Sequence, residues 1–138
     1  VDFCLERVNL QGRNALYPSE CSGGMQKRVG IARAIAMNPK YLFCDEPNSG
    51  LDPKTAIVID SLIKDITYEY GITTIVITHD MNSVMEIGDN VIFIHQGKKW
   101  WEGDRHSIIT TDNPEIEAFV FASEFMKKIR SSLKERIK

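Results

Sequence analysis

The sequence lacks the features that mark membrane-spanning, secreted and strongly basic proteins. No apolar run approaches the roughly 20 residues that a transmembrane helix needs, and the charged start of the chain is unlike a signal peptide. The three cysteines show no CxxC or other metal-ligand spacing, which indicates reduced thiols in a cytoplasmic protein. A net charge of −2 argues against binding nucleic acid through bulk positive charge. We therefore expect a cytoplasmic chain with no nucleic-acid partner and no direct insertion into a membrane.

What the sequence does contain is the hydropathy pattern of an α/β fold. Residues 41–44 and 73–77 are unbroken apolar or β-branched runs, which predict two strands covered on both faces. Between them, a helix is expected to begin at Asp52-Pro53 and to end at Tyr70-Gly71. Strand, helix and strand in this order predict a mainly parallel sheet flanked by helices.

Four further segments are expected to be regular: helices after Gly24 and over residues 81–87, and two strands over 90–95 and 98–102. A tight Gln96-Gly97 turn joins the two strands. From Pro114 to Lys138 apolar residues recur at four-residue steps, which predicts a helical tail. We accordingly divide the chain into a domain over residues 1–113 and a C-terminal helical tail over 114–138.

Two acids follow the first predicted strand directly. Asp45 and Glu46 stand at its carboxyl end, where open α/β sheets bind ligands. Adjacent residues of an extended strand point to opposite sides. One carboxylate could therefore hold a hydrated Mg²⁺ while the next polarises an attacking water. The alternative is a strand that simply ends in two solvated acids.

A glycine pair opens the first predicted helix. In Ser22-Gly23-Gly24-Met25, backbone N–H groups, a hydroxyl and the helix dipole would all favour a phosphate. The alternative is a flexible N-cap without function. His79 follows the second strand and would lie at the same sheet edge as Asp45, although a histidine there can also be a plain polar terminus. Ser49 to Asp52 likewise can be only a turn and an N-cap.

In order and spacing, these segments resemble the ATP-binding-cassette (ABC) family over roughly residues 18–103. Ser22-Gly23-Gly24 is similar to its signature loop, and residues 42–46 to its Walker B strand with the catalytic Glu. Ser49 to Asp52 resembles the D-loop, and His79 the switch histidine. The resemblance implies the C-terminal part of a P-loop NTPase fold, with ATP and Mg²⁺ as cofactors.

The resemblance also implies roles and partners. Two copies would meet head to tail, so that the signature loop of each, with Ser22 to Met25, closes over ATP held by the other. Asp45 would position Mg²⁺, Glu46 would activate water and His79 would steady the γ-phosphate. Asp52 would link the two ATP sites. The ATPase would drive a membrane permease from the inner face of the cell membrane.

Two departures from the family pattern bear on activity. Cys21 replaces the usual Leu of the signature loop. No GxxxxGK[ST] loop occurs in the 138 residues, although this Walker A loop normally cradles the β- and γ-phosphates. The chain also begins with Val1 and not with Met, so we expect the loop to precede it in a longer protein. Residues 1–138 alone are therefore expected to have negligible ATPase activity, to bind nucleotide weakly and to expose part of an apolar sheet face.

The residues before Tyr17-Pro18, Met25 and the short segment after Asn113-Pro114 further resemble the lipid-asymmetry (Mla-type) transporters. This narrower resemblance implies phospholipid as the cargo. One alternative is a soluble ABC ATPase of DNA repair or translation, although no coiled coil or second cassette is visible. Another is a non-catalytic half that acts as an interaction module.

Overall fold

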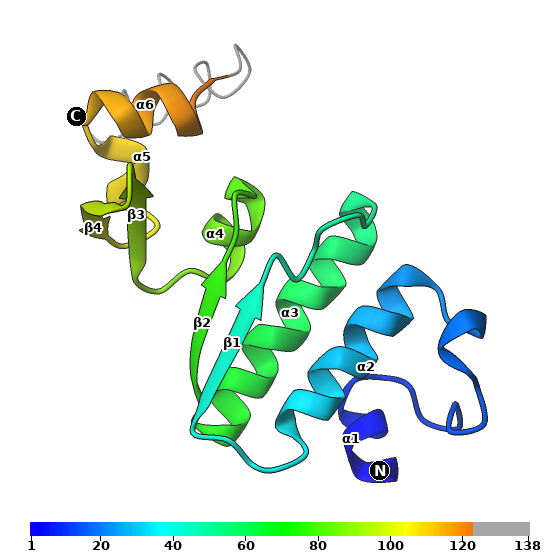
Figure 1. Cartoon of the computed structure of the whole chain (residues 1–138). Helices are drawn as coiled ribbons and strands as arrows, with labels where there is room; N and C mark the ends of the chain where they lie inside the picture. Colours follow the sequence, from blue (N-terminus) through cyan, green and yellow to red (C-terminus); the bar gives the residue numbers. More distant parts are fainter. Residues whose placement is uncertain (123–138) are drawn as a thin grey trace. The chain divides into compact units, whose positions relative to one another are not determined.

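The computed structural model describes residues 1–122, which fold as two compact units, one over Val1–Ile87 and one from Gly88 onward. The elements of the first unit are α1 (Asp2–Arg7), the 3₁₀ helix η1 (Pro18–Glu20), α2 (Gly23–Ile35), β1 (Tyr41–Asp45), α3 (Pro53–Tyr70), β2 (Thr73–Ile77) and α4 (Met81–Ile87) (Figure 1). The elements of the second unit are β3 (Val91–His95), β4 (Lys98–Gly103), α5 (Ser107–Thr110) and α6 (Pro114–Val120).

The first unit is built on two parallel strands. β1 and β2 pair in register, with Tyr41 opposite Thr73 and Asp45 opposite Ile77. Helices α2 and α3 lie on one side of the pair (Figure 1). The α/β fold with a parallel sheet is therefore confirmed. The buried core of this unit consists of Val8, Leu10, Ile31, Ala32, Ile35, Leu42, Cys44, Ile59, Leu62, Ile63, Ile66 and Ile72.

Each of these strands is covered on one face only, and the prediction of two covered faces is wrong. Leu42 and Cys44 are buried, whereas Phe43 between them is 68% exposed. On β2, Ile75 is 45% and Ile77 56% exposed. Because residues paired in register share a face, these side chains form one surface together with Tyr41, which we call the open face. An unbroken apolar run indicates that both faces of a strand are apolar. It does not indicate that other elements of the same chain cover both faces.

Helix ends follow the expected capping chemistry. The Ser22 hydroxyl accepts a hydrogen bond from the Met25 N–H at the start of α2. The Asp52 carboxylate accepts one from the Thr55 N–H at the start of α3. Gly71 ends α3 in the left-handed conformation, with φ +61°, that favours glycine.

The sequence patterns predicted no element before residue 21. The structure nevertheless has α1 there, which packs against α2, and Val8 is fully buried.

The second unit contains the predicted hairpin. β3 and β4 pair antiparallel, and Gln96 and Gly97 both have positive φ, as a type I′ turn requires. This pair is a sheet separate from β1 and β2. The predicted tail begins as α6, which ends at Val120, and Phe121 leaves the helix with φ −107° and a buried side chain. The rest of the predicted tail, residues 123–138, lies outside the described residues. The boundary at residue 113 remains a prediction.

None of the helices that the structure describes combines the length and apolar character that crossing a membrane requires.

Candidate functional site

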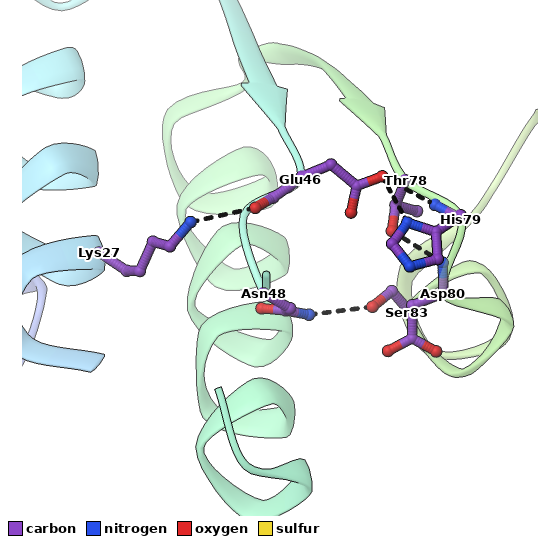
Figure 2. A network of polar contacts seen from close by, with 7 residues as sticks. All are labelled: Lys27, Glu46, Asn48, Thr78, His79, Asp80 and Ser83. Carbon is purple, nitrogen blue, oxygen red and sulfur yellow. Dashed lines mark hydrogen bonds and ion pairs between the residues drawn. The ribbon is translucent and has the colours of Figure 1, made fainter. Parts of the chain in front are cut away.

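Glu46 and His79 lie in contact at the carboxyl ends of the two parallel strands. Glu46 Oε1 is 2.7 Å from His79 Nδ1 and also accepts a hydrogen bond of 3.1 Å from the His79 backbone N–H (Figure 2). The His79 side chain is 77% exposed and that of Glu46 is 34% exposed. A carboxylate and an imidazole are thus held together where water and an anion can reach both. His79 was expected at the same sheet edge as Asp45, and the structure places it there, in contact with the next residue, Glu46.

The backbone of Glu46 departs from strand geometry to reach this position. Its φ is +45°, in the left-handed region that a glutamate rarely adopts. The Glu46 N–H still donates to the Ile77 carbonyl at 2.9 Å, which continues the pairing of β1 and β2 by one residue. The Glu46 carbonyl accepts hydrogen bonds from Lys27 Nζ at 3.1 Å and from the Ser49 N–H at 3.2 Å. A turned backbone, and not the alternation of an extended strand, therefore directs Glu46 toward His79.

The electrostatics of the pair favour a charged histidine. The hydrogen bond to Glu46 raises the pKa of His79 above its ordinary value near 6.5, and the charges of Glu46 and Asp80 add to this. An imidazole in this state carries a positive charge and N–H donors toward an approaching anion. The Glu46 carboxylate beside it can accept a proton from a bound water.

Asp45 occupies a different surface from Glu46. It is the last residue of β1, and its exposed side chain lies on the open face because its pairing partner is Ile77. In proteins Mg²⁺ commonly takes one or two carboxylates together with waters and substrate phosphates. A single exposed carboxylate is compatible with that mode of binding. Within residues 1–122, no cluster of three or more Asp, Glu, His or Cys side chains could hold a metal by itself.

The predicted phosphate-binding segment, Ser22 to Met25, stands at the amino end of α2. This end lies at the same edge of the first unit as the carboxyl end of β1 (Figure 1), and Lys27, one turn along α2, reaches Glu46 (Figure 2). Gly23 is exposed, whereas Gly24 is buried. A Cβ on Gly24 would approach Thr55 Cγ2 of α3 to 2.6 Å, so this glycine permits the close packing of two helices.

Asp52 is the N-cap of α3, as predicted by the simpler interpretation of Ser49 to Asp52 as a turn and an N-cap. Its carboxylate accepts hydrogen bonds from the Thr55 N–H at 3.0 Å and from Thr55 Oγ1 at 2.5 Å. The hydrogen bond from the Thr55 hydroxyl lowers the pKa of Asp52, and the backbone bond adds to that effect.

Sequence reasoning missed four residues that hold the site together: Lys27, Asn48, Asp60 and Ser83. Asp60 carries the one signal that could have been read, because it interrupts the apolar side of α3 between Ile59 and Ile63. Its partners are Asn48 in the loop after β1 and Ser83 in the first turn of α4, and no local pattern connects these segments.

Comparison with known proteins places these features in a family. A family described as ABC transporter matches residues 1–49. The methionine import ATP-binding protein MetN of Desulfitobacterium hafniense is 40% identical over 94% of this chain, and the match covers 38% of that relative. MetN of Carboxydothermus hydrogenoformans is 50% identical over 72% of this chain and 29% of its own length.

Solved structures give the same answer. A dimer of the ATP-binding cassette MJ0796 in a post-hydrolysis state, bound to ADP and Pi, matches with a TM-score of 0.64 and 38% identity. That match covers 75% of this chain and 44% of the other chain. The chain thus spans less than half the length of these relatives.

These relatives correct one expectation. The two MetN proteins are methionine import ATP-binding proteins, so the narrower resemblance to phospholipid transporters is not supported. The broader resemblance, to the ABC family, is supported. The chain has the fold of the ABC ATPase cassettes and corresponds to part of an ABC transporter ATP-binding domain.

Proposed function

We propose that the protein containing this chain is the ATP-hydrolysing subunit of an ABC transporter, with Glu46 as the general base. The contact of 2.7 Å between Glu46 Oε1 and His79 Nδ1 carries this proposal. It sets an acceptor for the proton of an attacking water beside a cationic donor for the phosphate that the water attacks. In this role His79 stabilises the charge that develops on the γ-phosphate.

Asp45 is the proposed Mg²⁺ ligand, and bound Mg²⁺ would neutralise charge on the phosphates. Its place on the open face, next to the turn that carries Glu46, supports this assignment. ATP is the proposed nucleotide. The phosphate-gripping loop GxxxxGK[ST] does not occur in residues 1–138, so hydrolysis requires chain beyond these residues.

A second copy of the ATPase is the proposed partner across the nucleotide. The Ser22 Oγ accepts from Met25 N–H, which leaves its own O–H available to donate, and Gly23 is exposed at the positive end of α2. Ser22, Gly23, Gly24 and Met25 would contact ATP held by the other copy, and Asp52 would connect the two sites. The dimeric cassette that this chain resembles supports the arrangement.

A membrane permease is the second proposed partner, which would hold the subunit at the inner face of the cell membrane. Methionine or a similar amino acid is the proposed cargo, on the strength of the relatives' names alone. These relatives favour a transporter over a soluble ABC ATPase of DNA repair or translation. Residues 1–113 are proposed to serve the ATPase and residues 114–138 to form its tail.

Hydrolysis of ATP by the intact protein tests the catalytic proposal. Glu46→Gln should lower kcat about a hundredfold or more while leaving ATP binding in place. Glu6→Gln, a change of an exposed glutamate on α1, serves as the matched control and should leave kcat unchanged. Residues 1–138 alone should show negligible turnover. A Glu46→Gln variant that hydrolyses ATP at the unmodified rate would refute the role of Glu46.

Methionine uptake into cells that lack other methionine importers tests the cargo. Uptake should depend on the gene for this protein and fall with Glu46→Gln. Uptake that persists unchanged without the protein would exclude methionine as its cargo.

A further inference from the structure

An acidic side chain is buried in the apolar side of α3. Asp60 is only 3% exposed and is flanked by Ile59 and Ile63, which are fully buried. A buried carboxylate is costly unless hydrogen bonds compensate the loss of water. Neither the cap of α3 nor the contact between Glu46 and His79 uses this residue directly. Its partners therefore have to explain why it is there.

Asp60 is the acceptor in a closed set of three side chains. Asn48 Nδ2 donates to Asp60 Oδ1 at 2.8 Å and to Ser83 Oγ at 2.9 Å. The Ser83 hydroxyl in turn hydrogen-bonds to the Asp60 carboxylate. Ser83 is 1% exposed, so water does not compete for these contacts. We call Asn48, Asp60 and Ser83 the clamp.

The orientation of the Asn48 amide is fixed by this arrangement. Both N–H bonds of Nδ2 have acceptors, whereas the buried Oδ1 has no hydrogen-bond partner among the described residues. Turning the amide over would place its oxygen against two acceptors, Asp60 and Ser83. Asp60 therefore decides which way Asn48 points, and through it where Ser83 is held.

The clamp joins the two segments that follow β1 and β2 and that carry the candidate catalytic pair. Asn48 follows Glu46 by two residues in the loop after β1, and Ser83 follows His79 by four residues in the first turn of α4. Figure 2 shows the Asn48–Ser83 bond and the Glu46–His79 contact as two separate bridges between these segments. The Glu46–His79 contact is exposed, whereas the Asn48–Ser83 bond is part-buried.

We infer that Asp60 is a positioning residue, which orients Asn48 and Ser83 so that the loops after β1 and β2 hold Glu46 against His79. It acts through these residues and touches no reacting atom. This inference rests on the proposed function for its effect on hydrolysis, but its geometric part does not depend on it.

The charges around the clamp indicate that Asp60 serves to position its partners and not to stabilise the fold. Burial raises the pKa of Asp60, the hydrogen bonds from Asn48 and Ser83 oppose this, and the charges of Asp80 and Glu86 raise the pKa further. Lys64 lies one turn along α3, where its Nζ donates to the Glu86 carbonyl at 3.5 Å. A leucine of similar size would avoid the cost of burying a charge at this position.

The first test follows the His79 imidazole by NMR titration of the intact protein without nucleotide. Asp60→Leu removes the acceptor and should move the pKa of His79 toward its ordinary value of about 6.5. Asp60→Asn keeps an acceptor oxygen and should preserve most of the raised pKa. Ile66→Ala removes core volume lower on α3 and is the control for general destabilisation, so the pKa should not move. An unchanged His79 pKa in Asp60→Leu would overturn the inference.

Where Asp60→Leu does not fold, Asn48→Ala measured in the same way decides between the same two outcomes.

The second test measures ATP hydrolysis at a temperature where all variants are folded. Asp60→Leu should lower kcat about tenfold or more with little change in KM for ATP, because misplacement of catalytic groups affects the chemical step. Asp60→Asn should recover most of the loss and Ile66→Ala should lose none. Equal losses in Asp60→Leu and Ile66→Ala would mark Asp60 as merely structural. If the unmodified protein hydrolyses no ATP, the proposed function is wrong. The His79 titration still tests whether Asp60 positions Asn48 and Ser83.

Discussion

Lys27 Nζ donates a hydrogen bond of 3.1 Å to the backbone carbonyl of Glu46. The lysine belongs to the second turn of α2 and the glutamate to the turn after β1, so the bond ties the candidate signature helix to the candidate general base. Because Glu46 adopts a left-handed backbone with φ +45°, surrounding contacts have to compensate its strain. Lys27 is one of these contacts.

Removing that donor should weaken the fold at this point. We expect Lys27→Met to lower the free energy of unfolding by about 1 to 2 kcal/mol, since a charged donor to a strained carbonyl is lost. Arg33→Met, a charge removal at an exposed position of the same helix, should change it by at most a few tenths. Urea unfolding of both variants makes the comparison. Equal effects of the two changes would show that the Lys27 bond contributes nothing specific.

Gly24 should resist substitution because of packing. A Cβ there would come within 2.6 Å of Thr55 Cγ2, so Gly24→Ala should force α2 and α3 apart and lower the melting temperature. Thr55→Ser removes that methyl group while keeping the hydroxyl that bonds to Asp52. The double variant should therefore recover most of the loss, as thermal unfolding of all four proteins can measure. A double variant as unstable as the sum of the single changes would contradict this explanation.

The contact between His79 and Glu46 should make stability depend on pH. Its hydrogen bond raises the folded-state pKa of His79 above about 6.5. The stabilisation is then fully present below about pH 6.5 and is lost as the pH rises through the raised pKa. Denaturant unfolding at several pH values, with Glu46→Gln for comparison, should show this loss only with the native carboxylate. Asp80→Asn should lower the pKa of His79 less than Glu46→Gln does, because Asp80 is the weakest of its causes.

The open face should make the isolated 138 residues self-associate. Tyr41, Phe43, Ile75 and Ile77 present an apolar surface from two neighbouring strands, and such surfaces drive association in water. The apparent mass in light scattering should rise with concentration, and Phe43→Ser with Ile75→Thr should reduce that rise. Val58→Thr, at an exposed apolar position of α3, is the control. A monomer at all concentrations would contradict the prediction.

The local chemistry of the chain was sufficient to predict its elements from α2 to β4, but not α1, η1 or α5. Capping residues such as Asp52 and Gly71, and the Gln96-Gly97 turn, act on the backbone beside them, so the bounds of α3 and of the hairpin could be read directly. The meeting of Glu46 and His79 could also be predicted, because the carboxyl ends of parallel strands share one edge. In both cases the deciding interaction lies within a few residues or follows from topology.

Tertiary structure alone decided the rest. Whether Phe43 or Leu42 is buried depends on which face the helices cover, and both residues are equally apolar in the sequence. Gly24 looked like a phosphate-binding glycine, and only the approach of Thr55 gave it a packing role. Asp60, Asn48 and Ser83 are separated by 12 to 35 residues, so their hydrogen bonds exist only once α3 has packed against α4 and the loop after β1. Side-chain partners brought together from distant segments leave no periodic signal, which is why sequence reasoning found the candidate catalytic pair but not the residues that hold it.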